Sequence, residues 1–153
     1  MTTVLIVDDH YAVRAGLNEL LRSTPDLDVV GMAHAGDAAI EMAAMLRPDV
    51  VLMDIALPVV DGIEATRTIT QQRPEAVVLI LSTYDDAGHM EQALAAGAHG
   101  YMRKDVPPDA LVAGIRNAAY NWVSFLPGVE PPLRVDHANV IGPHRKPRRR
   151  VHF

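Results

Sequence analysis

Apolar residues in positions 1–120 form short runs of strand length, and longer segments with helical periodicity lie between them. The runs are continuously apolar rather than alternating, which indicates strands covered on both faces, as in a parallel sheet. This pattern predicts an α/β domain, with a doubly wound, five-stranded parallel sheet and five helices on its two faces. The predicted strands are Val4–Val7, Val29–Ala33, Val50–Met53, Val77–Leu81 and Gly100–Met102. The predicted helices are Ala12–Leu21, Ala38–Leu46, Ile63–Gln72, Ala87–Ala96 and Asp109–Tyr120.

Polar residues follow four of the five predicted strands, directly or within two positions. In chain order they are Asp8 and Asp9, Asp54, Ser82 and Thr83, and Lys104. In a doubly wound sheet, the carboxyl ends of the strands form the edge at which ligands bind. We therefore expect these side chains to lie close together and to form one site.

Three carboxylates at this edge repel one another, and a divalent cation relieves the repulsion. Oxygen ligands favour Mg²⁺, and Mn²⁺ is also compatible with them. With the metal bound, a carboxylate can attack phosphorus and form an aspartyl phosphate. Lys104 and the Ser82 hydroxyl would then contact the phosphoryl oxygens. The cluster therefore predicts a site for phosphoryl chemistry.

Each of these residues also has an ordinary structural explanation when it is taken alone. An acidic pair after a strand often caps the next helix, and polar residues are common in turns. We interpret His10 as the residue that starts the first helix. The corresponding explanations are capping for Asp8 and Asp9, a turn for Asp54, a cap or turn for Ser82 and a solvated surface position for Lys104. Their joint placement favours the phosphoryl site.

Composition divides the chain into two parts. Residues 1–120 hold 17 acidic and 8 basic residues, whereas residues 121–153 hold 2 acidic and 6 basic residues. We predict one domain over residues 1–120 and a flexible, proline-rich, basic tail over residues 121–153, without a recognisable output domain. The absence of cysteine excludes disulfides and a cysteine-based zinc site. The N-terminal segment does not resemble a signal peptide and no run is long enough to span a membrane, so we expect a cytoplasmic protein.

Four segments carry a resemblance to a known family. They read VLIVDDH, RPDVVLMDIALPVVDGIEATR, VVLILSTYDD and ALAAGAHGYMRKD. From Thr3 to about Tyr120 the chain resembles the receiver domain of two-component response regulators, in particular the NarL/FixJ branch. The resemblance implies a flavodoxin/CheY-like sheet with strand order 2-1-3-4-5.

The resemblance also implies a role for each residue of the predicted site. Asp54 would be the phospho-acceptor, and Asp8, Asp9 and the backbone carbonyl of Ala56 would complete the metal site. Ser82, with Thr83 as the neighbouring candidate, and Lys104 would contact the phosphoryl group. Tyr101 would be the aromatic residue that changes position on activation.

The partners follow from the same resemblance. A sensor histidine kinase would dock on helix Ala12–Arg22 and donate the phosphoryl group. The surface formed by the last two helices and the last strand would then change and support a homodimer on activation. The protein would be a signalling switch rather than an enzyme, and it would be part of a transcriptional regulator.

Three departures from the family pattern affect these expectations. Ala56 is too small to orient water and Tyr84 is bulky, so we expect slow loss of the phosphoryl group. Val59 and Val60 replace the usual Gly-Met pair, and because valine disfavours positive φ we expect a slightly different loop path. Residues 121–153 lack the amphipathic helices of the helix-turn-helix domain that usually follows in this branch, so we expect no such domain within them.

Two further functions compete with this interpretation. A phosphatase of the haloacid-dehalogenase type needs a second aspartate two residues after the nucleophile, where this chain has Ala56. The second is a stand-alone receiver that acts through protein partners instead of a transcriptional regulator. The basic cluster Arg145–Arg150 is a candidate for non-specific contact with DNA, although no DNA-binding domain supports it.

Overall fold

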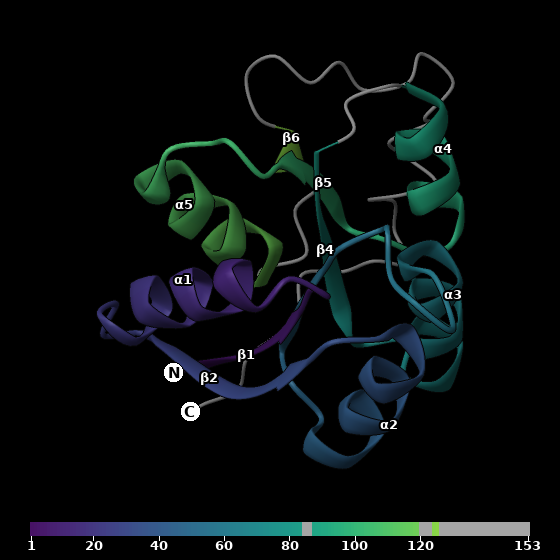
Figure 1. Cartoon of the computed structure of the whole chain (residues 1–153), viewed down its shortest axis with the longest axis horizontal. Coiled ribbons are helices and arrows are strands. Elements are labelled where there is room, and N and C mark those ends of the chain that lie inside the picture. Colours follow the sequence, from purple (N-terminus) through teal and green to yellow (C-terminus); the bar gives the residue numbers. More distant parts are fainter. Residues whose placement is uncertain (84–86, 120–123, 126–153) are drawn as a thin grey trace.

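A parallel β-sheet in the order β2-β1-β3-β4-β5-β6 forms the centre of the molecule (Figure 1). The computed structural model describes residues 1–83, 87–119 and 124–125. The strands are β1 (Thr2–Val7), β2 (Leu27–Ala33), β3 (Val50–Met53), β4 (Val77–Ser82), β5 (Gly100–Arg103) and β6 (Ser124–Phe125). The helices are α1 (Tyr11–Arg22), α2 (Gly36–Leu46), α3 (Gly62–Gln72), α4 (Ala87–Ala95) and α5 (Pro108–Ala119).

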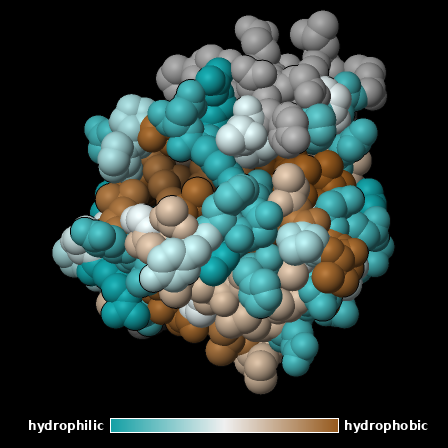
Figure 2. Space-filling view, in the orientation of Figure 1, coloured by the Kyte–Doolittle hydropathy of each residue, from teal (hydrophilic) through white to brown (hydrophobic). Residues whose placement is uncertain are grey.

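The helices cover both faces of the sheet, with α1 and α5 on one side and α2, α3 and α4 on the other (Figure 1). Successive strand residues point to opposite faces, so a central strand must be apolar at every position. In β1, Leu5 and Val7 lie in the core beneath α2, α3 and α4, whereas Val4 and Ile6 lie in the core beneath α1 and α5. Apolar residues also reach the surface between α1 and α5 (Figure 2).

The predicted fold is confirmed. The five expected strands are parallel and lie in the order 2-1-3-4-5, and the helices alternate with them as predicted. The sequence did not predict β6, which pairs with β5 through Gly100–Ser124 and Tyr101–Phe125. A strand of two residues has no periodicity to detect, so only its pairing reveals it. The rest of the predicted tail lies outside the described residues, and no described helix has the length and apolarity that a membrane span requires.

The loop between β3 and α3 folds back tightly behind the end of β3. Its closure depends on a hydrogen bond of 2.8 Å from the Gly62 N–H to the Ile55 carbonyl. A Cβ atom at position 62 would lie 1.8 Å from the backbone oxygen of Asp54. Only glycine therefore permits this approach, which fixes the loop directly behind Asp54.

Val59, in the same loop, has a φ of 70° in the left-handed region. The valine therefore adopts the positive φ that it disfavours. The residue is 81% exposed, so its side chain gains little from packing. Its backbone strain is of the order of 1–2 kcal/mol.

We expect Val59→Gly to stabilise the domain. Relief of the strain exceeds the added entropy of the unfolded glycine, which leaves a net gain of about 0.5–1 kcal/mol. Urea unfolding measures this gain directly. Val59→Ala is the matched control, because alanine removes the branched side chain but retains the strained φ, and it should gain less. An equal gain for both variants would show that backbone strain is not the cause.

Candidate functional site

Four side chains from four different strand ends meet at the carboxyl edge of the sheet. Asp8 follows β1, Asp54 follows β3, Ser82 ends β4 and Lys104 follows β5. The backbone continues the sheet ladder at this edge, because the Asp54 N–H donates to the Val7 carbonyl at 3.0 Å. The Lys104 N–H likewise donates to the Ser82 carbonyl at 2.9 Å. The sheet itself therefore holds the predicted residues together.

Lys104 joins the two buried carboxylates. Its Nζ lies 2.6 Å from Oδ2 of Asp8 and 3.2 Å from Oδ2 of Asp54. Asp8 is 1% exposed and Asp54 is 4% exposed, so neither charge is well solvated. The lysine thus supplies the counter-charge that is missing from the sequence around Asp54.

The pKa values reflect this arrangement. Burial and the negative charge of Asp8 raise the pKa of Asp54, and Lys104 offsets only part of that effect. Burial alone would lower the pKa of Lys104, but its hydrogen bond to Asp8 and the charge of Asp54 raise it instead. The lysine therefore stays positively charged, while the Asp54 carboxylate is held in an unfavourable environment.

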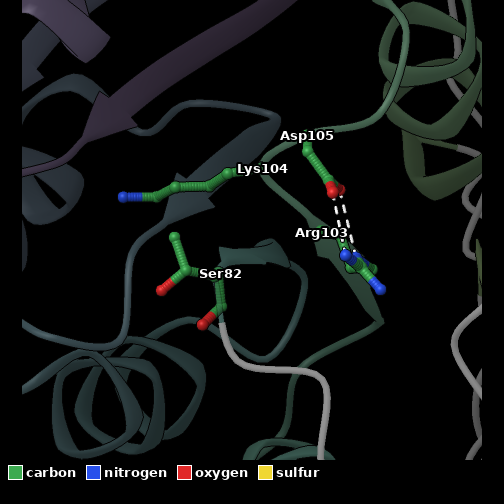
Figure 3. A pocket seen from close by; sticks show the side chains of 5 residues that line it. Ser82, Arg103, Lys104 and Asp105 are labelled. Atoms are coloured by element: carbon green, nitrogen blue, oxygen red, sulfur yellow. Dashed lines mark hydrogen bonds and ion pairs between the residues drawn. The ribbon is translucent and has the colours of Figure 1, made fainter.

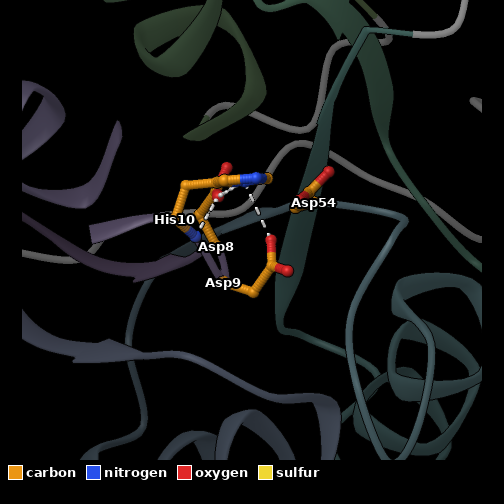
Figure 4. Close-up of side chains that lie close together, drawn as sticks. All are labelled: Asp8, Asp9, His10 and Asp54. Carbon is orange, nitrogen blue, oxygen red and sulfur yellow. Dashed lines mark hydrogen bonds and ion pairs between the residues drawn. The ribbon is translucent and has the colours of Figure 1, made fainter. Parts of the chain in front are cut away.

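The carboxylates also form a potential cation site. Asp8, Asp9, His10 and Asp54 each offer a ligand atom, and these four atoms lie within 4.8 Å of one another (Figure 4). Asp9 has a half-exposed side chain and provides the open side of the cluster. A set of carboxylate oxygens next to solvent fits a hard divalent cation that retains some of its water ligands. Ala56, the remaining predicted metal-site residue, is exposed in the loop after Asp54.

Ser82 and Lys104 line a pocket of about 220 Å³ with Thr83, Arg103 and Asp105 (Figure 3). The Ser82 residue is fully buried, whereas Thr83 is exposed. On the other side of this pocket, Arg103 and Asp105 form an ion pair of 2.8 Å. The structure thus brings Ser82 and Lys104 together as predicted and adds an ion pair at the rim of the pocket.

Tyr101, the predicted aromatic residue, lies in the core and not in the acidic cluster. Tyr101 is fully buried in the core beneath α2, α3 and α4, and its backbone pairs with Ile80. Tyr84 lies outside the described residues.

The guanidinium of Arg14 donates a hydrogen bond of 2.7 Å to the backbone carbonyl of Asp8. The sequence did not predict this role at the site. The position of Arg14, one turn into α1, could have indicated this contact, because a long side chain there can reach back to the end of the preceding strand. His10 starts α1 as predicted, but its side chain makes no capping hydrogen bond. Its ring instead lies beside Asp8 and Asp9.

Comparisons with known proteins give a consistent result. A family model described as a response regulator receiver domain matches residues 4–116. The transcriptional regulatory protein DegU of Brevibacillus brevis is 35% identical over 138 residues, which cover 90% of this chain and 58% of that protein. The nitrate/nitrite response regulator protein NarL of Escherichia coli K12 is 33% identical over 131 residues, which cover 86% of this chain and 61% of that protein.

Among solved structures, a two-component response regulator of the LuxR family from Aurantimonas sp. SI85-9A1 is 32% identical to this chain. The two structures match with a TM-score of 0.81 over 95% of this chain and 98% of that chain. The two curated relatives are longer proteins, and this chain spans less than two thirds of either one.

The raised pKa of Asp54 predicts the effect of Asp54→Asn on stability. The unfolded carboxyl ionises near its ordinary value of 3.8, and the folded one ionises at higher pH. Between these two pKa values, the native state binds more protons than the unfolded state does. The free energy of unfolding therefore falls as the pH rises through this range. In metal-free buffer, we expect Asp54→Asn to be more stable than the unmodified protein at pH 7.

Urea unfolding at several pH values measures this difference, which should shrink as the pH falls toward 3.8. Asp28→Asn is the control, because Asp28 is an exposed aspartate on β2. A destabilised Asp54→Asn at pH 7 would contradict the assignment of burial as the dominant effect.

Proposed function

Because the chain belongs to the family of response regulator receiver domains, we propose that it accepts a phosphoryl group on Asp54 from a histidine kinase, in a Mg²⁺-dependent reaction. The receiver resemblance predicted from the sequence is confirmed, including its similarity to NarL-type regulators. The domain is a signalling phospho-acceptor rather than an enzyme, which excludes the phosphatase function. The observation that supports Asp54 best is its convergence with Asp8 and Lys104.

The proposed chemistry uses the residues at this edge of the sheet. An oxygen of Asp54 attacks phosphorus, the phosphorus–nitrogen bond of the phosphohistidine breaks, and the electron pair returns to the imidazole. Bound Mg²⁺, held by Asp8, Asp9, Asp54 and the Ala56 carbonyl, would neutralise charge on the transferring group. Lys104 already lies 3.2 Å from the attacking carboxylate and would pair with a phosphoryl oxygen.

The proposed response to phosphorylation starts at Ser82. Its hydroxyl lies at the end of β4, next to Lys104, and would donate to the remaining phosphoryl oxygen, with exposed Thr83 as the second candidate donor. Tyr101 pairs with β4 two residues before Ser82 and would repack when Ser82 moves. The surface formed by α4, β5 and α5 would then change and support a homodimer.

The partners remain part of the proposal. A response regulator implies a cognate histidine kinase, and helix α1 is the docking surface that we propose for it. Tyr11, the first residue of α1, is 76% exposed and is available for such a contact. The similar protein DegU is a transcriptional regulatory protein, so we propose a transcriptional role in the cytoplasm. A stand-alone receiver and DNA contact by Arg145–Arg150 compete with that role, and the basic cluster lies outside the described residues.

A phosphoryl-donor assay tests the acceptor directly. With a labelled small-molecule phosphoryl donor and Mg²⁺, the unmodified protein should acquire acid-stable, base-labile label, and Asp54→Asn should remain at background. Omission of Mg²⁺ should also abolish labelling, because Lys104 alone cannot offset the charge of three carboxylates and of the transferring group. Asp28→Asn is the matched control and should label normally. Equal labelling of the unmodified protein and Asp54→Asn would refute the assignment.

The exposed Ala56 predicts a long-lived phosphoryl group. Its methyl side chain cannot hydrogen-bond to an attacking water, whereas asparagine at this position can. We expect Ala56→Asn to lose the phosphoryl group about tenfold faster, which corresponds to about 1.4 kcal/mol in the barrier. Ala56→Val is the control, because it enlarges the side chain without adding a polar group. A phosphoryl lifetime that is longer in Ala56→Asn than in the unmodified protein would overturn this explanation.

A further inference from the structure

His10 places an imidazole ring among the carboxylates of the acidic cluster. Its Nδ1 lies 3.0 Å from Oδ1 of Asp9 and 3.3 Å from Oδ1 of Asp8. Figure 4 shows the ring directed toward the same space as the three carboxylates. A sequence interpretation of His10 as a helix-start residue accounts for its backbone but not for this ring position.

The backbone of His10 is held in place independently of its ring. The residue is the N-cap of α1, with φ −93° and ψ 118°, and its N–H donates to Oδ1 of Asp8 at 2.9 Å. The side chain makes no capping hydrogen bond to the helix. Its ring is therefore not required for starting α1, and it stands on the solvent side of the cluster with 69% of its surface exposed.

The two oxygens of Asp8 face different partners. Oδ2 faces Lys104 on the buried side, whereas Oδ1 faces His10 on the open side. A cation that enters from solvent would consequently meet the exposed His10 ring and the Asp9 carboxylate before it reaches the buried carboxylate of Asp8. Lys104 occupies the opposite side of the same carboxylate.

The spacing between His10 and Asp9 fits two ligands of one metal ion. Adjacent ligands of an octahedral ion, each about 2.1 Å from it, lie about 3.0 Å apart. The observed distance between Nδ1 of His10 and Oδ1 of Asp9 is 3.0 Å. A neutral imidazole nitrogen binds metals such as Co²⁺ and Ni²⁺ well, whereas Mg²⁺ prefers oxygen.

We propose that His10 is a side-chain ligand of the metal site and raises its preference for Co²⁺-like metals over Mg²⁺. This inference rests on the proposed metal-dependent receiver site and names one determinant of its metal selectivity. An all-oxygen site at the same edge would favour Co²⁺ over Mg²⁺ less strongly. Mg²⁺ would gain little from the ring, so its binding depends mainly on the carboxylates.

Calorimetric titration of Co²⁺ and of Mg²⁺, each into the full chain without a phosphoryl donor, tests the proposal. His10→Ala should weaken Co²⁺ binding about tenfold or more, which corresponds to at least about 1.4 kcal/mol, and should change Mg²⁺ binding less than about threefold. The visible spectrum of bound Co²⁺ should also change in this variant. His34→Ala is the matched control, because His34 is an exposed histidine outside the cluster.

Two results would overturn the proposal. If His10→Ala strengthens the binding of both metals equally, the ring only donates a hydrogen bond to the carboxylates and competes with the cation. If the Co²⁺/Mg²⁺ affinity ratio does not change, His10 has no role in selectivity. His10→Asn guards against a folding defect, because asparagine is a good N-cap residue and should also lose the Co²⁺ preference while it retains Mg²⁺ binding.

Failure of this inference differs from failure of the proposed function. Labelling of Asp54 with an unchanged Co²⁺/Mg²⁺ ratio would overturn the role of His10 alone. Loss of Co²⁺ preference in His10→Ala, together with equal labelling of the unmodified protein and Asp54→Asn, would overturn the phospho-acceptor assignment alone.

Discussion

Two buried carboxylates that share one lysine impose the central constraint on this domain. Asp8 and Asp54 are almost fully buried and repel each other, and Lys104 reaches both within 3.2 Å. Each group comes from a different strand end, so residues adjacent in sequence cannot form this pairing of two carboxylates with one lysine. The arrangement is stable only because the sheet brings β1, β3 and β5 to the same edge.

Much of the surrounding architecture serves to hold these groups still. The strands are apolar on both faces, which anchors them between two cores and leaves only their ends for polar residues. Gly62 allows the chain to turn directly behind the backbone of Asp54, and Arg14 fixes the carbonyl of Asp8. The positive φ of Val59 lies in the same turn. The site is thus associated with both unfavourable charge burial and backbone strain, which is common where structure serves function rather than stability.

The sequence predicted the sheet and its polar edge because both depend on patterns that extend over many residues. Continuous apolar runs identify parallel strands, and the topology then brings Asp8, Asp54, Ser82 and Lys104 together without any contact having to be known. It did not predict β6, the ring position of His10 or the contact of Arg14. These features depend on individual side-chain directions or on a pairing of two residues, and no periodicity encodes them. The positive φ of Val59 was likewise unpredictable, because the disfavoured conformation is imposed by the closure of the loop.

The shared lysine also indicates how a local event can change the domain. Before phosphorylation, Lys104 is divided between Asp8 and Asp54, and Asp54 retains a raised pKa because that compensation is incomplete. On the proposed function, a phosphoryl group on Asp54 adds charge and oxygen acceptors within reach of the same lysine, while a bound cation neutralises Asp8 and Asp9. Lys104 would then pair mainly with the phosphoryl group. Lys104 follows β5 directly, and its backbone N–H donates to the carbonyl of Ser82 at the end of β4, so a shift of the Lys104 backbone would act on β4 and β5 together. The electrostatic conflict among Asp8, Asp54 and Lys104 would therefore couple this site to the surface of α4, β5 and α5.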